Sequence, residues 1–140
     1  MKAIYTAEAL ATGEGRDGHA RTSDGKVDLD LSIPKEMGGS GVGTNPEQLF
    51  AAGYAACFHS ALRMVAGQEK ADVTDSTVGA RVAIGSLDNG GFGLAVELEV
   101  ALPNLDHETA QKLADKAHEV CPYSNATRGN IDVNVVVTDD

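Results

Sequence analysis

Hydrophobic and polar positions alternate along four stretches of the chain, with the two-residue period of a half-buried β-strand. The four stretches are 27–33, 78–84, 94–100 and 131–137. The glycine-rich segment 88–91 separates the second stretch from the third and is typical of a hairpin loop. A less regular alternation predicts further strands over 3–10 and 19–23, with a turn at Asp24-Gly25.

Two other stretches have the period of an α-helix. The first begins at Asn45, a good N-cap residue, followed by Pro46, which suits the first helical position, and Gly67 is expected to end it. This helix is apolar almost all round, so it should be covered on nearly every side, and a partner subunit is a reasonable source of that cover. The second helix begins near Asp106 and ends before Pro122. The order of strands, helix, strands, helix and strand predicts an α+β fold.

The length of 140 residues is that of one domain, which we place over 1–140. A domain of this size buries a core of its own and needs no disulfide bond to stabilise its fold. The longest apolar stretch, 49–66, contains His59 and Arg63, which disfavours a membrane span and favours a buried helix.

The net charge of −10, from 21 acidic and 11 basic residues, disfavours nucleic acid as a partner because it repels phosphate backbones. The N-terminal residues lack the apolar run of a secretory signal, which predicts a reducing, cytoplasmic location where thiols stay free. The glycine-rich segment 38–44 lacks the residues of a phosphate-binding loop and is interpreted as a connector.

The two cysteines, Cys57 and Cys121, have different sequence settings. Cys57 lies in the middle of the first predicted helix, where apolar neighbours raise a thiol pKa, so it needs a cation from elsewhere in the chain to become reactive. Phe50 and Tyr54 precede it on the same helix face. They either border a space that suits an organic substrate or are ordinary core residues, and their spacing leaves both interpretations open.

Cys121 lies where the second helix ends, and the helix dipole there disfavours an anion. It should therefore be the less acidic thiol, suited to condense with a sulfenic acid formed on another cysteine. His59 points away from Cys57 and is interpreted as a packed or hydrogen-bonded residue. The chain has no Cys-x-x-Cys pair, so no metal site is predicted. Sequence spacing does not show whether the two thiols meet, and unreactive core cysteines remain the alternative.

Two long blocks resemble the signature segments of the organic hydroperoxide resistance proteins, which belong to the OsmC-like superfamily. The first block runs from Thr44 to Phe58 and includes Cys57, and the second runs from Val120 to Val133 and includes Cys121. The similarity extends along essentially the whole chain. It implies an OsmC-like fold with antiparallel strands packed on two main helices, in an intertwined homodimer with a buried central helix.

The resemblance also implies an activity, that of a thiol peroxidase that reduces organic and fatty-acid hydroperoxides to alcohols. Cys57 takes the peroxidatic role and Cys121 the resolving role. The resulting disulfide is reduced by dihydrolipoyl groups on a lipoylated protein or by another dithiol. No cofactor or membrane is implied.

By the same resemblance, the catalytic arginine is Arg16 and its partner carboxylate is Glu47, with Arg21 and Arg128 as alternative cations. Two interpretations without catalysis stay open beside this one. The chain could be a peroxide sensor or small-lipid-binding module, or a structural dimer subunit whose thiols belong to the core.

Overall fold

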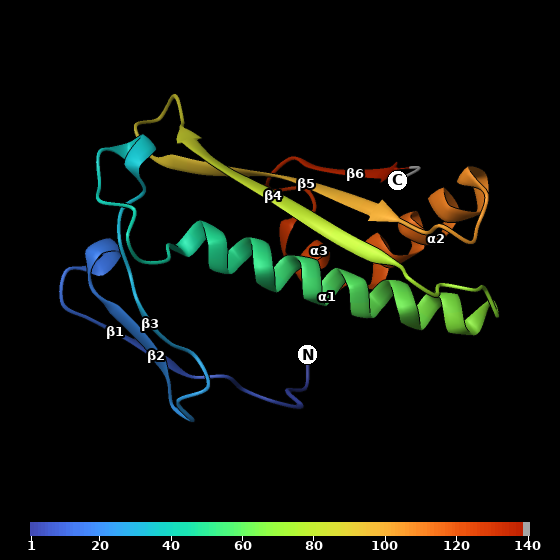
Figure 1. The fold of residues 1–140 in the computed structure, drawn as a ribbon, viewed down its shortest axis with the longest axis horizontal. Coiled ribbons are helices and arrows are strands. Elements are labelled where there is room, and N and C mark those ends of the chain that lie inside the picture. The colour runs from blue at the N-terminus through green and yellow to red at the C-terminus, as the bar shows by residue number, and fades with distance from the viewer. Residues whose placement is uncertain (139–140) are drawn as a thin grey trace. The chain divides into compact units, whose positions relative to one another are not determined.

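The structure is a computed structural model that describes residues 1–138. The chain divides into two compact units, an N-terminal unit, Met1–Leu49, and a C-terminal unit, Phe50–Asp140. Both helices and strands are present, which confirms the predicted α+β class (Figure 1).

The N-terminal unit contains a small antiparallel sheet with the strand order β1-β2-β3. Its strands are β1 (Ala9–Thr12), β2 (His19–Thr22) and β3 (Asp28–Asp30), and two short 3₁₀ turns, η1 (Gly15–Asp17) and η2 (Lys35–Met37), lie in the connecting segments. The first strand begins later than the predicted 3–10, and β3 is shorter than the predicted 27–33. Residues 1–8 are all exposed, so no buried face selects a strand there.

The C-terminal unit contains a larger sheet with the order β4-β5-β6. Strand β4 (Thr77–Ser86) pairs antiparallel with β5 (Phe92–Ala101), as the hairpin signal at 88–91 predicts. Strand β6 (Val133–Thr138) pairs with β5 in parallel. The expectation of antiparallel strands is wrong for this pair, because two helices intervene between β5 and β6 and return the chain in the same direction.

Within residues 1–138, three α-helices complete the fold: α1 (Pro46–Gln68), α2 (His107–Val120) and α3 (Pro122–Thr127). The predicted starts of the two long helices are confirmed by their caps. The side chain of Asn45 accepts a hydrogen bond from the backbone N–H of Gln48 at 2.9 Å, and Asp106 caps α2 in the same way. The short helix α3 was not predicted.

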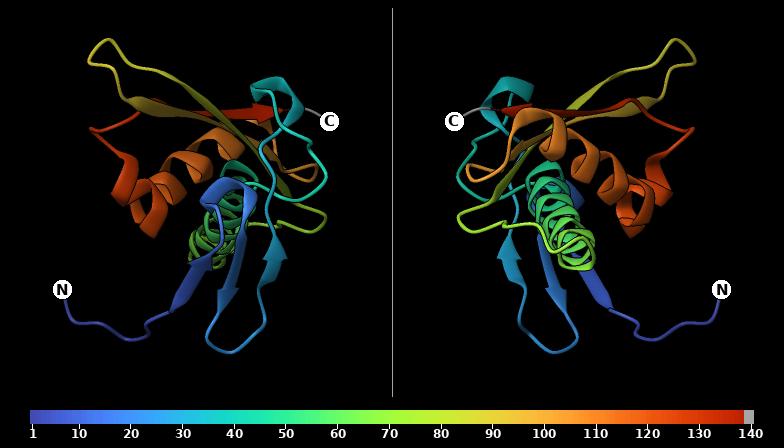
Figure 2. Two further views of the ribbon diagram at one scale, coloured as in Figure 1. Left: turned by 90° about the vertical axis from the view of Figure 1, so that its left-hand side faces the viewer. Right: turned by 90° about the vertical axis from the view of Figure 1, so that its right-hand side faces the viewer.

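Helices α1 and α2 lie on one face of the larger sheet, as the two side views show (Figure 2). The core between them is built from apolar side chains of both helices and of the inward-facing strand positions. Its fully buried large members include Tyr54, Phe58, Leu62, Leu98, Val100 and Leu113. The opposite face of the sheet carries charged pairs, such as Arg81 with Glu97 at 2.7 Å.

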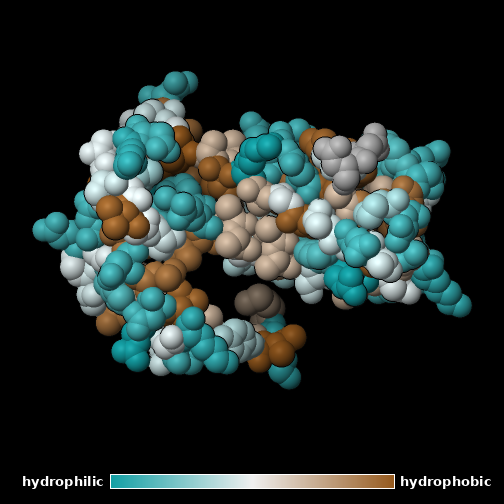
Figure 3. Space-filling view, viewed as in Figure 1, coloured by the Kyte–Doolittle hydropathy of each residue, from teal (hydrophilic) through white to brown (hydrophobic). Residues whose placement is uncertain are grey.

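Helix α1 is not covered all round. One side is buried, but Ala52, Ala56, Ser60 and Met64 lie on an exposed stripe, and apolar atoms gather over the first half of α1 in the space-filling view (Figure 3). By length and composition alone this helix could also span a membrane, a test that the core helix of a soluble protein passes equally. Cover from a partner subunit stays a prediction.

Candidate active site

The two thiols lie side by side in the C-terminal unit. Cys57 is in the middle of α1, Cys121 lies between α2 and α3, and their sulfur atoms are 3.7 Å apart. Both cysteines are free. A disulfide bond is about 2.05 Å long, so the two sulfurs need to approach by about 1.7 Å to form one. The fold therefore brings together two residues whose proximity the sequence could not show.

The two thiols differ in exposure. Cys121 is fully buried, whereas Cys57 is partly exposed, because the side of α1 that carries it is only partly covered within this chain. A small molecule from solvent therefore reaches the sulfur of Cys57 more readily than that of Cys121.

Cys121 begins a helix as well as ending one. Its backbone N–H donates to the carbonyl of Ala117 at 2.9 Å, which closes α2, and its carbonyl accepts from Asn125 at 2.9 Å, which opens α3. The backbone N–H of Tyr123, in the first turn of α3, donates to the thiol of Cys57. Cys57 therefore has the start of a second helix, α3, beside it. Pro122 was the available signal, since proline favours the first helical position.

Burial raises the pKa of the Cys57 thiol, and the neighbouring Cys121 raises it further, while the hydrogen bond from Tyr123 lowers it. The net direction of the pKa shift is upward, so this thiol stays protonated near neutral pH. Cys57 therefore needs a cation from elsewhere in the chain to become reactive, as expected from the sequence.

A charged pair of the predicted residues lies in the N-terminal unit. The guanidinium of Arg16, in η1, donates two hydrogen bonds to the carboxylate of Glu47 at 2.8 and 2.7 Å. This bidentate geometry fixes the plane of the guanidinium group of Arg16. Arg16 lowers the pKa of Glu47, and Glu47 raises that of Arg16, so both groups stay charged. Arg16, not the exposed Arg21, is the loop arginine that binds Glu47.

Three aromatic rings pack together next to the thiols. Phe50 and Tyr54 from α1 and Tyr123 from α3 have ring centroids 5.6 to 6.1 Å apart. Tyr54 is fully buried, which favours core packing over substrate binding for this residue, while Phe50 is partly buried and Tyr123 is 40% exposed. The accessible apolar surface of the group thus comes from Phe50 and from Tyr123, which the sequence interpretation missed.

Polar contacts join the three helices α1, α2 and α3. Ser124 lies between His118 of α2 and Tyr54 of α1, and Arg128 donates to the carbonyl of His118 and to the side chain of Asn125. These bonds of Arg128 tie down the segment that carries Cys121. His59 is hydrogen-bonded to Ser76 at 2.9 Å, as interpreted from the sequence. Over residues 1–138, no group of three or more His, Cys, Asp and Glu residues is arranged to hold a metal.

Comparisons with known proteins show which family the chain belongs to. Residues 38–136 match the family described as OsmC-like protein. The chain is 55% identical over 138 residues to the organic hydroperoxide resistance protein of Xanthomonas axonopodis pv. citri, covering 97% of this chain and 96% of that one. The chain belongs to the family of organic hydroperoxide resistance proteins. The sequence resemblance is thereby confirmed.

Solved structures of this family also share the fold. The organic hydroperoxide resistance protein from Elizabethkingia anophelis, crystallised with thiocyanate bound, superimposes with a TM-score of 0.94 at 50% identity and full coverage of both chains. A family member from Legionella pneumophila gives a TM-score of 0.93 at 51% identity, covering 98% of this chain and 99% of that one. The predicted OsmC-like fold is therefore confirmed.

The packing of Tyr123 on α1 makes a testable prediction about Gly53. A Cβ atom at Gly53 would lie 3.1 Å from Oη and 3.3 Å from Cε2 of Tyr123, whereas one at Gly67, in the same helix, would meet nothing within 4 Å. Alanine stabilises a helix interior by about 0.5–1 kcal/mol relative to glycine. In urea unfolding, Gly67→Ala should gain up to that amount, and Gly53→Ala should gain less or lose stability because the Tyr123 ring has to move. An equal gain at both positions would contradict the described packing.

Proposed function

We propose that this protein is a cysteine-based peroxidase that reduces organic hydroperoxides to alcohols. The observation that carries the proposal is the pairing of a partly exposed cysteine, Cys57, with a fully buried one, Cys121, whose sulfur lies 3.7 Å from that of Cys57. The relatives at 55% and 51% identity are named for resistance to organic hydroperoxides, which supports a peroxide-resistance role for this chain.

The first chemical step takes place at the accessible thiol. The thiolate of Cys57 attacks the terminal oxygen of the hydroperoxide, the O–O bond breaks, and the alkoxide takes up a proton and leaves as the alcohol. Cys57 is thereby oxidised to a sulfenic acid.

The buried thiol completes the reaction. The sulfur of Cys121 attacks the sulfenic sulfur of Cys57, water leaves, and a disulfide forms. A dithiol then reduces this disulfide by two successive thiol–disulfide exchanges and is itself oxidised to a cyclic disulfide. A dihydrolipoyl group on a lipoylated protein is the donor we propose. Because Cys121 is buried, it is protected from reacting with the peroxide first.

Arg16 and Glu47 are proposed to activate Cys57. The guanidinium of Arg16 is the cation that the raised pKa of Cys57 calls for, and Glu47 holds that guanidinium in a fixed plane through two hydrogen bonds. Phe50 and Tyr123 present apolar surface near the thiol, which suits the organic part of the substrate better than a small polar peroxide.

The remaining features of the proposal concern the assembly. We propose that residues 1–140 act as one domain, that two copies form an intertwined homodimer in which the exposed stripe of α1 is covered, and that the protein works in the cytoplasm. The chemistry needs no metal or other cofactor, and neither nucleic acid nor a membrane has a part in it.

A stopped-flow comparison of substrates tests the proposed function. With excess dihydrolipoamide, a fatty-acid hydroperoxide should oxidise Cys57 much faster than hydrogen peroxide does, and the reaction should continue for many turnovers. A peroxide sensor with the same two thiols would be oxidised once and stop, and a structural subunit with core thiols would lose no free thiol. Either of these results would contradict the proposal.

The role of Arg16 gives a separate prediction. Removing a cation makes the thiolate less stable, so the proton of Cys57 is lost at a higher pH. In a Cys121→Ser background, where Cys57 is the sole thiol, Arg16→Ala should move the pH midpoint of alkylation upward by about one unit or more. Arg21→Ala, a matched change at the neighbouring arginine, should leave the midpoint unchanged. If Arg21→Ala produced the shift instead, the cation would have to be reassigned.

A further inference from the structure

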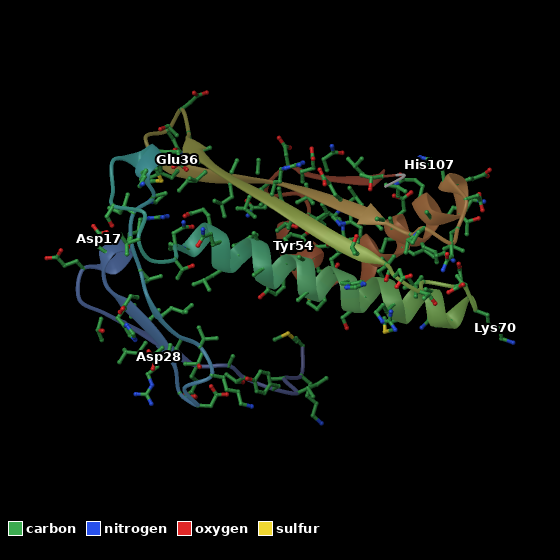
Figure 4. All side chains as sticks on the ribbon, in the orientation of Figure 1. Asp17, Asp28, Glu36, Tyr54, Lys70 and His107 are labelled. Atoms are coloured by element: carbon green, nitrogen blue, oxygen red, sulfur yellow. The ribbon has the colours of Figure 1, made fainter. Side chains whose placement is uncertain are left out.

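A chain of buried hydroxyl groups joins the helices that carry the two cysteines. The hydroxyl of Ser124 lies 2.7 Å from Nδ1 of His118 and 2.8 Å from the hydroxyl of Tyr54, and Tyr54 also lies 3.1 Å from the hydroxyl of Thr127. Tyr54 and Ser124 are completely buried and Thr127 nearly so. In the stick view, the label of Tyr54 shows where these linked hydroxyl groups lie (Figure 4).

One arrangement of protons lets every hydroxyl in the chain donate once. Thr127 donates to the carbonyl of Ser124 at 3.2 Å, so its oxygen is available to accept from Tyr54. Tyr54 then accepts from Ser124, and Ser124 accepts from the Nδ1–H of His118. Burial and the charge of Arg128 hold the pKa of His118 below its ordinary value, so the imidazole is neutral and has this single proton to give. All bonds in the chain can therefore be satisfied at once.

The chain of hydroxyls lies one helical turn away from each thiol. Tyr54 precedes Cys57 by three residues in α1, while His118 precedes and Ser124 follows Cys121 by three residues each. Residues three apart share a helix face, so the hydroxyl of Tyr54 and the sulfur of Cys57 lie on the same side of α1. Cys121 has an extended backbone between α2 and α3, so His118 and Ser124 flank it from the last turn of one helix and the first turn of the next. Within residues 1–138, the side-chain hydroxyls that bond from α1 to α3 are those of Tyr54, Ser124 and Thr127.

We propose that Tyr54, Ser124 and His118 are positioning residues that hold the sulfur of Cys121 within reach of the sulfur of Cys57. The sulfurs have only about 1.7 Å to close, and the hydroxyl of Tyr54 holds α3 against α1 beside them through its hydrogen bonds to Ser124 and Thr127. Without these two bonds, α3 is held to α1 mainly by apolar packing, which is less directional, and the mean distance between the sulfurs increases.

This inference deepens the proposed function but can be tested without a hydroperoxide. The purified protein is equilibrated in mixtures of reduced and oxidised dithiothreitol, and the fraction of the Cys57–Cys121 disulfide is measured by alkylation and mass spectrometry. The equilibrium constant gives the effective concentration of one thiol at the other, a quantity that depends on their positions.

Two variants should lower this effective concentration. Tyr54→Phe keeps the aromatic packing and removes the hydroxyl, and Ser124→Ala removes the centre of the chain. Each removes two buried hydrogen bonds and should reduce the effective concentration at least roughly five- to tenfold, the size expected for the loss of one of them. The matched control is Tyr123→Phe, which removes a hydroxyl from the same aromatic group for which residues 1–138 show no hydrogen-bond partner. The effective concentration in this variant should stay within about twofold of the wild-type value.

A purely structural role makes a different prediction. Tyr54→Phe and Ser124→Ala would then lower the midpoint of thermal unfolding while leaving the effective concentration in the folded protein at the wild-type value, and that result would overturn the proposal. If either variant does not fold, it is replaced by Thr127→Val, which removes the last hydroxyl of the hydrogen-bonded series. A wild type that forms no disulfide in the mixtures also overturns the proposal. A wild type that forms it but consumes no hydroperoxide contradicts the proposed function alone.

Discussion

Replacing Cys57 by serine is expected to abolish the consumption of organic hydroperoxides. The hydroxyl of serine does not ionise near neutral pH and is a poor nucleophile toward a peroxide oxygen, so the first bond cannot form. The size change is small and Cys57 is only partly buried, so the fold should be kept. The rate of loss of a fatty-acid hydroperoxide should fall on the order of 10³-fold or more, as for other enzymes that lose their nucleophile.

The control for this result is the same substitution at the other thiol. Cys121→Ser changes the same atom in a more buried place, and it should still consume peroxide in a first turnover. Wild-type turnover in Cys57→Ser would move the attack to another residue. Loss of the first turnover in both variants, with both folded, would contradict the assignment of unequal roles.

Cys121→Ser is expected to react once and then stop. Cys57 still attacks the hydroperoxide, but its sulfenic acid has no partner 3.7 Å away with which to condense. About one equivalent of peroxide per chain should be consumed, after which the sulfenic acid persists or is oxidised further to the sulfinic acid by excess peroxide. Mass spectrometry of the intact protein should show an increase of one and then two oxygen atoms on Cys57.

Sustained turnover of Cys121→Ser with dihydrolipoamide would count against a resolving role. It would show that the donor reduces the sulfenic acid directly and that Cys121 has another purpose. Adding back the donor after the first turnover separates the two cases, since a resolving role predicts little recovery once the sulfinic acid has formed.

The features that depend on neighbouring residues could be predicted from the sequence. The starts of α1 and α2 follow from Asn45 and Asp106, whose side chains cap the helices in the structure as expected. The β4–β5 hairpin follows from its two alternating strands and its glycine-rich loop. In each case the determining contact is made within a few positions along the chain, so the local pattern contains the information.

The features that depend on residues far apart in the sequence could not be predicted from it. Whether Cys57 meets Cys121, and which thiol is covered, depends on how α3 packs against α1. The parallel pairing of β6 depends on the path of the chain through α2 and α3. Helix α3 itself was missed because Pro122 was interpreted only as the end of a helix, although proline at the first position of a helix also begins one.

The candidate site shows the same division. Cys57 and Cys121 stand out in the sequence by their different settings, and Arg16 and Glu47 are candidates through the family resemblance. The structure joins these four residues into the two pairs of contacts described above. Tyr123, whose backbone reaches the thiol and whose ring packs on Gly53, was not identified. Its position depends on the three-dimensional start of α3, and no periodicity or spacing in the sequence marks it.

The most direct test of the central claim is to identify the product of one oxidation. The reduced wild-type protein is mixed with one equivalent of a fatty-acid hydroperoxide, quenched with an alkylating agent at intervals, and digested for peptide mapping. A peptide pair linked by a Cys57–Cys121 disulfide should accumulate after the alcohol is released, with about one link per chain at the end. Consumption of the hydroperoxide while both cysteines remain fully alkylated would contradict the account.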